Sequence, residues 1–266
     1  MDDQTAQHGG GNGVEETDEG RICDRCGGTL LTVRLVINGQ VLLTNKGQTS
    51  CNDCLEKAEV AHERELKAIQ RATLMQRLEA ASHKDERLEV VSFSTFAEGP
   101  HNRTAKGLAE KWVVMQAPRN VIIHGPVGCG KTYLARCMRV ALTEREIPSL
   151  WLSVGELVEQ SKRGWGDREA QQRAAVVRDL AKGAPVLFLD DLGKNKGNGD
   201  GGWMEELLYS IVDPRYRAKL PTVVTTEWTG DDLVTRSGKS VVSRLEHGAW
   251  ILGVKAPKEP YRRPAS

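Results

Sequence analysis

The feature that most limits how this chain can fold is a glycine-rich run, HGPVGCGKTYL, at residues 124–134. It matches the pattern GxxxxGK[ST] through Gly125, Gly130, Lys131 and Thr132. The apolar letters VII precede the run and a helical pattern follows it, which is the context that this pattern requires. Glycines let several backbone N–H groups converge on one anion at a helix N-terminus. The run therefore predicts a phosphate-binding loop.

Each side chain of this loop has an expected task if the phosphates belong to ATP. Lys131 reaches the β and γ phosphates, and the hydroxyl of Thr132 is a ligand of Mg²⁺. The alternative is a glycine-rich turn that matches the pattern by chance. The residues expected to contact the nucleotide are Gly125, Pro126, Gly128, Cys129, Gly130, Lys131, Thr132 and Tyr133.

A second run, PVLFLDDLG, carries the acids that such a loop needs. Four apolar residues, 186–189, lead directly into Asp190 and Asp191. A buried strand that ends in an acid suits a Mg²⁺ site beside phosphates. We assign Asp190 to the metal, through water, and Asp191 to orienting or deprotonating the attacking water. The alternative for Asp191 is that it only caps the following turn.

From about residue 91 onward, short apolar runs alternate with segments of helical pattern. The runs are NVIIHG, SLWLS, PVLFLDD, PTVVTT and WILGV. Strands separated by helix-length segments are typical of an α/β domain with a parallel sheet. We expect this domain to occupy residues 91–266.

Four of the six cysteines form two CxxC pairs, Cys23 with Cys26 and Cys51 with Cys54. Two such pairs supply four thiolates that can surround Zn²⁺ as a tetrahedron. A module over residues 21–54 has almost no apolar core, so a metal would supply its folding free energy. We therefore predict a small zinc-ribbon-like module. A redox dithiol and a pair of disulfides are the alternatives.

The flanking segments have simpler compositions. Residues 1–20 contain six acidic residues, five Gly and no Lys or Arg, which predicts a disordered tail. Residues 55–90 are rich in Glu, Lys, Arg, Ala and Leu, which predicts a connecting helix.

No apolar run reaches transmembrane length and no secretory signal begins the chain, so we expect a cytoplasmic protein without a membrane partner. A net charge of +1 argues neither for nor against nucleic acid.

Taken together, these motifs make the chain resemble AAA+ ATPases of the DnaC/IstB type, the bacterial and phage replicative helicase loaders and their relatives. The resemblance covers roughly residues 92–263. FSTFAEGPHN resembles the lead-in of that family, GPVGCGKTYLA its Walker A and VLFLDDLG its Walker B. LLYSIVDPRYRAKLPTVVTTEW is similar to its helix, Arg-Tyr pair and sensor strand, and SVVSRLEHG to its arginine-finger segment.

The resemblance implies a P-loop domain with a five-stranded parallel sheet and slow, switch-type ATP hydrolysis. It places Thr226 in the sensor-1 region, near the γ-phosphate or the attacking water. It also places Arg244 at the arginine finger, which acts on ATP in a neighbouring subunit, and Arg262 at sensor 2. The family often has Asn just after the Thr/Ser pair, whereas this chain has Glu227. The alternatives are a surface arginine for Arg244 and a disordered, Pro-rich end for Arg262.

The resemblance also implies the partners: a replicative DNA helicase hexamer, single-stranded DNA, and further copies of the AAA+ domain. We expect an ATP-dependent loader whose zinc module docks on the helicase, because that module lacks the interleaved aromatics of a nucleic-acid surface. Lys162, Arg163 and Arg168 around Trp165 are the candidate DNA-facing loop. Two alternatives remain open: an IstB-like helper of a DNA transposase, and a zinc-bearing adaptor with a structural nucleotide.

Overall fold

The computed structural model describes most of the chain as two compact units, Met1–Gln70 and Arg71–Ser266. Each unit is treated by itself below. The residues that the structure describes are 13–37, 40–45, 47–83, 91–115, 119–163, 166–194 and 202–256.

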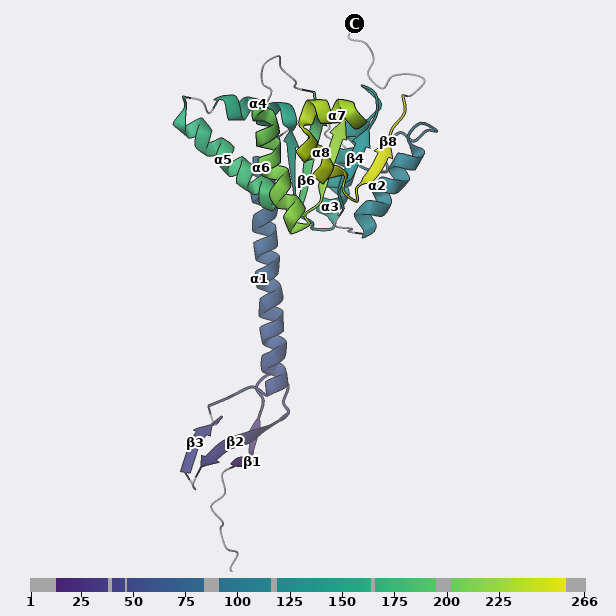
Figure 1. Ribbon diagram of the computed structural model, residues 1–266. Helices are drawn as coiled ribbons and strands as arrows, with labels where there is room; N and C mark the ends of the chain where they lie inside the picture. The colour runs from purple at the N-terminus through teal and green to yellow at the C-terminus, as the bar shows by residue number, and fades with distance from the viewer. Residues whose placement is uncertain are drawn as a thin grey trace, which may run out of the picture. The chain divides into compact units, whose positions relative to one another are not determined.

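The N-terminal unit contains a three-stranded antiparallel sheet in the order β1-β2-β3 (Figure 1). Its strands are β1 (Gly13–Ile22), β2 (Thr29–Ile37) and β3 (Gln40–Thr44). The central strand, β2, has the β-branched and apolar composition that favours strands. Its residues Leu30, Thr32 and Val36 are buried on one face.

The expectation of a disordered tail over residues 1–20 is wrong from Gly13 onward. That residue begins β1, which pairs with β2 from Gly13 opposite Val36 to Ile22 opposite Thr29. A backbone ladder needs no apolar side chains, and the side chains of Glu16 and Asp18 in β1 remain exposed to water. Pairing therefore leaves these two carboxylates hydrated. Residues 1–12 lie outside the described part of the chain.

The connecting helix is α1 (Asn52–Ala81), which begins before the expected residue 55 and includes Cys54 in its first turn. The expected domain boundary at residue 91 is also too late, because the second compact unit begins at Arg71, inside this helix. Leu78 is completely buried in the core of that second unit. Residues 84–90 lie outside the described part of the chain.

The C-terminal unit has the expected α/β fold: a five-stranded parallel sheet, in the order β5-β6-β7-β4-β8, with helices packed against it (Figure 1). Its strands are β4 (Val121–His124), β5 (Ser149–Ser153), β6 (Val186–Leu192), β7 (Thr222–Thr226) and β8 (Trp250–Gly253). Its helices are α2 (Arg103–Met115), α3 (Lys131–Glu144), α4 (Val154–Arg163), α5 (Arg168–Gly183), α6 (Trp203–Ala218), α7 (Gly230–Ser237) and α8 (Lys239–Glu246).

Both faces of this sheet are covered, which explains why its strands read as continuous apolar runs. Alternate residues of β4 enter opposite cores. Ile122 joins a cluster with residues of α4, α5, α6 and α8, whereas Val121 and Ile123 join a cluster with residues of α2 and α3.

A buried arginine fixes the edge of the sheet where the strands begin. The guanidinium of Arg215, in α6, donates hydrogen bonds to the carbonyl oxygens of Ala181, Ala184 and Pro221 and to the hydroxyl of Thr222. Hydrogen bonds from a charged group contribute about 1.5–3 kcal/mol each. Arg215 thereby joins the turn before β6 to the turn before β7.

Among the described residues, no helix is long and apolar enough to cross a membrane.

Candidate nucleotide and metal sites

Three adjacent strands bring the two nucleotide motifs together. In the sheet, β7 lies between β6 and β4, and all three run parallel. Their carboxyl ends therefore meet at one edge, where ligands of open α/β sheets bind. The phosphate-loop candidate follows His124 at the end of β4, and His124 lies opposite Thr226 at the end of β7. The N–H of Gly125 donates to the carbonyl of Thr226 at 3.3 Å.

The backbone of the loop requires glycine where the sequence has it. Gly125 has φ +156°, and a Cβ there would lie 2.0 Å from the carbonyl oxygen of Val254. Gly128 has φ +77°, and Gly130 has φ +97° directly before the first turn of α3. The loop thus leads from a strand into a helix N-terminus, as a phosphate cradle does. Cys129, between two of these glycines, is completely buried.

Lys131 is buried, and its ammonium group is held by the loop itself. Its Nζ atom donates to the carbonyl oxygens of Gly125 and Pro126, each at 2.9 Å. Both acceptors are neutral, so the positive charge remains available to an anion bound in the loop.

Asp190 connects the two nucleotide motifs. Its Oδ1 atom accepts hydrogen bonds from the hydroxyls of Thr132, at 3.0 Å, and Thr225. Burial raises the pKa of Asp190, and the bond from Thr225 partly opposes that rise. A bound cation would favour the ionised carboxylate, so this Thr–Asp pair fits a Mg²⁺ site. Sequence reasoning missed Thr225, although it is the first residue of the Thr225–Thr226 pair.

Asp191 has different surroundings. Its backbone adopts φ +60°, and its N–H donates to the hydroxyl of Thr225 at 2.9 Å. A left-handed conformation at a residue other than glycine costs on the order of 1–3 kcal/mol and marks functional positions. Its carboxylate accepts a hydrogen bond from Lys194 at 2.9 Å and is about one-third exposed. The two neighbouring aspartates are therefore presented to different partners.

The hydroxyl of Thr226, the sensor-1 candidate, is bonded to two backbone groups. It donates to the carbonyl of Leu192 at 2.8 Å and accepts the N–H of Trp228 at 3.1 Å, and Thr226 itself is fully buried.

Glu227 follows Thr226 and is half-buried. Burial raises the pKa of Cys129, Lys131 opposes the rise, and the charge of Glu227 adds to it. Glu227 therefore lies within electrostatic reach of the loop.

Arg244 lies at the opposite edge of the sheet from its own phosphate loop. Its backbone carbonyl accepts a hydrogen bond from Asn120, the residue that enters β4. The guanidinium donates to Asp213 at 2.8 Å, to the hydroxyl of Tyr209 at 2.9 Å and to the carbonyl of Ser240 at 3.0 Å. Burial alone would raise the pKa of Asp213, but the bonds from its arginine partners bring it below its usual range.

Two further expected site residues lie outside the described part of the chain. They are Arg262, assigned to sensor 2, and Trp165, at the centre of the candidate DNA-facing loop.

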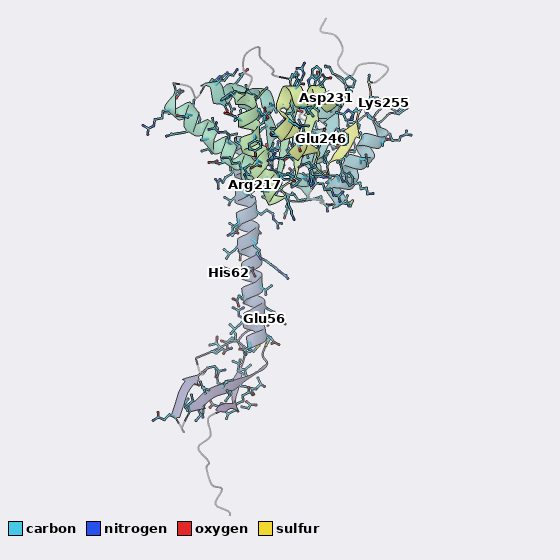
Figure 2. All side chains as sticks on the ribbon, in the orientation of Figure 1. Glu56, His62, Arg217, Asp231, Glu246 and Lys255 are labelled. Carbon is cyan, nitrogen blue, oxygen red and sulfur yellow. The ribbon has the colours of Figure 1, made fainter. Side chains whose placement is uncertain are left out.

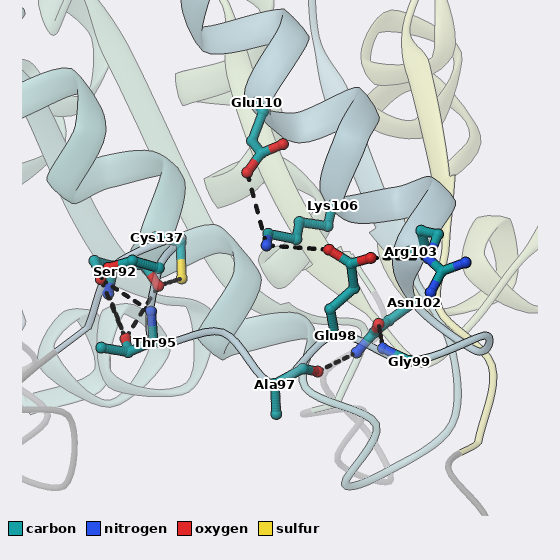
Figure 3. A network of polar contacts seen from close by, with 11 residues as sticks. Ser92, Thr95, Ala97, Glu98, Gly99, Asn102, Arg103, Lys106, Glu110 and Cys137 are labelled. Atoms are coloured by element: carbon teal, nitrogen blue, oxygen red, sulfur yellow. Dashed lines mark hydrogen bonds and ion pairs between the residues drawn. The ribbon is translucent and has the colours of Figure 1, made fainter.

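The lead-in before α2 is bound to the helix that follows the phosphate loop. The hydroxyl of Tyr133 contacts that of Thr95 at 2.8 Å, and the Tyr133 ring packs on Phe96 at 5.8 Å. Figure 3 shows Cys137 of α3 donating to the carbonyl of Ser92 at 3.1 Å. Burial raises the pKa of Cys137 to about 12, so its thiol stays protonated and acts as a small core residue.

The same lead-in is fixed at its other end by an ion-pair network (Figure 3). Glu98 accepts hydrogen bonds from Arg103 at 2.8 Å and Lys106 at 3.2 Å, and these bonds lower its pKa. Asn102 bridges the turn by donating to the carbonyl of Ala97 and accepting the N–H of Gly99. The lead-in is therefore positioned beside the first turns of α3.

The four paired cysteines form one cluster in the N-terminal unit. Their sulfur atoms all lie within 4.8 Å of one another, and those of Cys26 and Cys51 are 3.7 Å apart. Zn–S bonds of about 2.3 Å in a tetrahedron separate sulfurs by about 3.8 Å, so the donor set fits Zn²⁺. Hydrogen bonds to the sulfur of Cys23, the largest contribution coming from the N–H of Cys51, lower the pKa of Cys23 to about 6. All six cysteines are free thiols, which disfavours the disulfide alternative.

The fold and these two sites agree with the comparison to known families. Residues 30–263 match the model of the IstB-like ATP binding proteins. The chain belongs to this family. It is therefore an ATP-binding AAA+ protein of the DnaC/IstB type, as the motifs indicated.

Individual relatives are more distant. The replicative helicase loader DnaI of Bacillus subtilis is 26% identical over 134 residues, which are 50% of this chain and 37% of that protein. The chain thus spans little more than a third of that relative's length. A putative ATP-binding protein in an insertion sequence of Mycobacterium tuberculosis is 26% identical over 217 residues, 79% of this chain and 83% of that protein. The crystal structure of the DnaC helicase loader, 23% identical, superposes with a TM-score of 0.55 over 64% of this chain and 100% of that one, which shows the shared fold.

The cysteine cluster yields the first prediction. Cys51→Ser removes one of the four sulfurs, so we expect zinc affinity to fall by roughly 100-fold or more, since even outer partners of metal ligands contribute 10–100-fold. The N-terminal unit should then lose its cooperative thermal transition. Zinc content by mass spectrometry and melting by circular dichroism measure both effects. Cys137→Ala is the control and should keep its zinc; equal zinc in Cys51→Ser and wild type would contradict the assignment.

Proposed function

We propose that this protein is an ATP-dependent loader that binds a replicative DNA helicase and delivers it onto single-stranded DNA. The observation that carries the proposal is the combination of a four-cysteine module with an AAA+ domain whose phosphate loop and Walker B acid are both in place. The helix α1 joins the two. ATP binding and hydrolysis would switch the complex between assembled and released states.

Each residue of the nucleotide site has its own proposed role in ATP binding and hydrolysis. Backbone N–H groups of the loop and Lys131 would bind the phosphates. Thr132, and Asp190 through water, would hold a Mg²⁺ ion, which would supply charge neutralisation at the phosphates. Asp191 orients or deprotonates the attacking water. Thr225, through its hydrogen bonds to both aspartates, keeps them in position.

Arg244 acts on ATP bound by a neighbouring copy. One observation supports this proposal: the backbone of Arg244 lies beside Asn120, at the edge of the sheet opposite its own loop. The Arg244 side chain is about one-quarter exposed and bonded to Asp213, so it has to leave that carboxylate to reach a neighbour. If Arg244 leaves Asp213 to reach a neighbour, Arg217 still pairs with that carboxylate. The buried carboxylate of Asp213 would therefore keep one cationic partner after Arg244 leaves. This avoids the large free-energy cost of an unpaired buried charge.

This proposal predicts complementation between two inactive variants. Lys131→Ala lacks phosphate binding, and Arg244→Ala should lose roughly 10³-fold in ATPase rate, as arginine fingers do. An equal mixture should regain about a quarter of wild-type activity, because that share of random interfaces joins an intact loop to an intact arginine. A steady-state ATPase assay measures this, with Arg173→Ala as the exposed-arginine control. A mixture as inactive as its components would contradict the action on a neighbour.

A second candidate function is an ATPase helper of a DNA transposase. It is favoured by the description of the matching family and by the insertion-sequence relative, of which the chain covers 83%. The zinc-bearing adaptor with a structural nucleotide has weaker support, since this chain keeps Lys131, Thr132 and Asp190, the residue types that ATP hydrolysis uses.

A reconstitution with the host's replicative helicase separates these functions. We expect wild type and helicase to co-elute on size exclusion and to transfer the helicase to single-stranded DNA with ATP. Cys23→Ser/Cys26→Ser should abolish the complex, because it removes two sulfurs of the docking module. Lys131→Ala should form the complex and lose the ATP-dependent transfer, whereas an adaptor would be indifferent to it. No complex, with ATP-dependent assembly on duplex DNA instead, would identify the transposase helper.

A further inference from the structure

A basic hollow lies on the C-terminal unit, away from both sites described above. Its volume is about 570 Å³, and its charged or aromatic lining residues are Arg119, Tyr216, Arg217, Lys219 and His247. The described residues that line it include no acid.

The hollow is formed by the three segments that enter adjacent strands. Residues 119–120 precede β4, residues 216–220 precede β7, and residues 247–248 precede β8. These strands lie side by side in the order β7-β4-β8. Their amino ends are separated from the phosphate loop by the length of the strands, roughly 13 Å at about 3.3 Å per residue. In Figure 2, Arg217 lies at one edge of this unit and Lys255, which follows β8, at the other.

The cations of the hollow are largely uncompensated. Within the described part of the chain, Arg119 and Lys219 form no ion pair, and both are exposed. Arg217 pairs with Asp213, but that carboxylate is shared with Arg244. Two arginines on one carboxylate leave a net positive charge beside the hollow. Such a surface attracts a polyanion, with an affinity that falls as salt increases.

Tyr216 adds an aromatic surface to this charge. It is 41% exposed, with its ring at 81° and 5.5 Å from that of His247. Lys219 ends helix α6 in a left-handed conformation, φ +56°, and its N–H donates to the carbonyl of Tyr216. Tyr216 and Lys219 both line the hollow. Cations that track phosphates beside an exposed ring that stacks a base are the features of single-strand binding surfaces.

We propose that this hollow binds single-stranded DNA, with phosphates on Arg119 and Lys219 and a base on Tyr216. The proposal rests on the DNA-associated function proposed above and names the residues that contact the DNA. A single strand fits better than a duplex, because only unpaired bases offer their faces to a side chain. The alternative occupant is an acidic surface of a neighbouring copy.

The test uses the full-length protein and fluorescence anisotropy with a labelled oligo-dT at several salt concentrations. Arg119→Gln/Lys219→Gln should weaken binding by roughly 10-fold or more at low salt. It should also reduce the slope of log K against log salt by about 1.4, because each lost single-strand phosphate contact contributes about 0.7. Arg173→Gln/Lys182→Gln removes the same charge from α5, away from the hollow, and should leave affinity and slope unchanged.

Tyr216→Leu should weaken binding by roughly 5-fold or more without changing the salt slope, because stacking releases no counterions. Binding of a fluorescent ATP analogue checks that each variant is folded.

Wild-type affinity and slope in the Arg119/Lys219 double variant would overturn the proposal, and so would a duplex that binds as tightly as oligo-dT. Loss of self-association in sedimentation, with single-strand affinity unchanged, would assign the hollow to a neighbouring copy. A wild type that binds no single-stranded DNA would refute the proposed function and the hollow together, whereas a variant that binds like wild type refutes the hollow alone.

Discussion

The carboxylate of Asp190 and the two threonine hydroxyls that donate to it form the contact on which the nucleotide site depends. Thr132 belongs to the first turn of α3, Asp190 to β6 and Thr225 to β7, so one carboxylate connects three elements. Thr225 also accepts the backbone N–H of Asp191. A cation bound beside Asp190 would therefore interact electrostatically with both aspartates and with the helix that begins at the phosphate loop.

The two edges of the parallel sheet carry different groups. The carboxyl ends of the strands hold the glycine loop and the Walker B acids. The amino ends hold the buried Arg215, the arginine-finger candidate Arg244 and the basic hollow. Arg244 is separated from the phosphate loop of its own copy by the length of the strands. Any effect of Arg244 on ATP would therefore be exerted on ATP bound by another copy. Tyr216 borders the hollow and lies 5.8 Å from the guanidinium of Arg244, so the hollow and the finger candidate share one surface.

The sequence predicted features whose signal is local, and it failed where the answer depends on distant residues. The glycine loop, the apolar strands and the CxxC pairs are set by spacings of a few residues. The hydroxyl that faces Asp190 belongs to Thr225, and this choice depends on the pairing of β7 with β6, whose register shifts between Leu189 and Leu192, so the sequence alone did not single out Thr225. The partners of Arg244 come from α6, about thirty residues earlier, and no spacing rule predicts them. Strand β1 was missed because its acidic, glycine-containing composition is not typical of a strand, whereas its pairing with β2 is a backbone ladder.

The most direct test of this account is the Mg²⁺ dependence of ATP binding, measured by calorimetry for wild type and Asp190→Asn. Asparagine keeps an oxygen that accepts both threonine hydroxyls but removes the negative charge that would hold the metal. We expect Mg²⁺ to tighten ATP binding to wild type, and we expect Asp190→Asn to bind ATP with an affinity that no longer responds to Mg²⁺. An unchanged Mg²⁺ response in Asp190→Asn would contradict the assignment of this carboxylate, and with it the arrangement of the site.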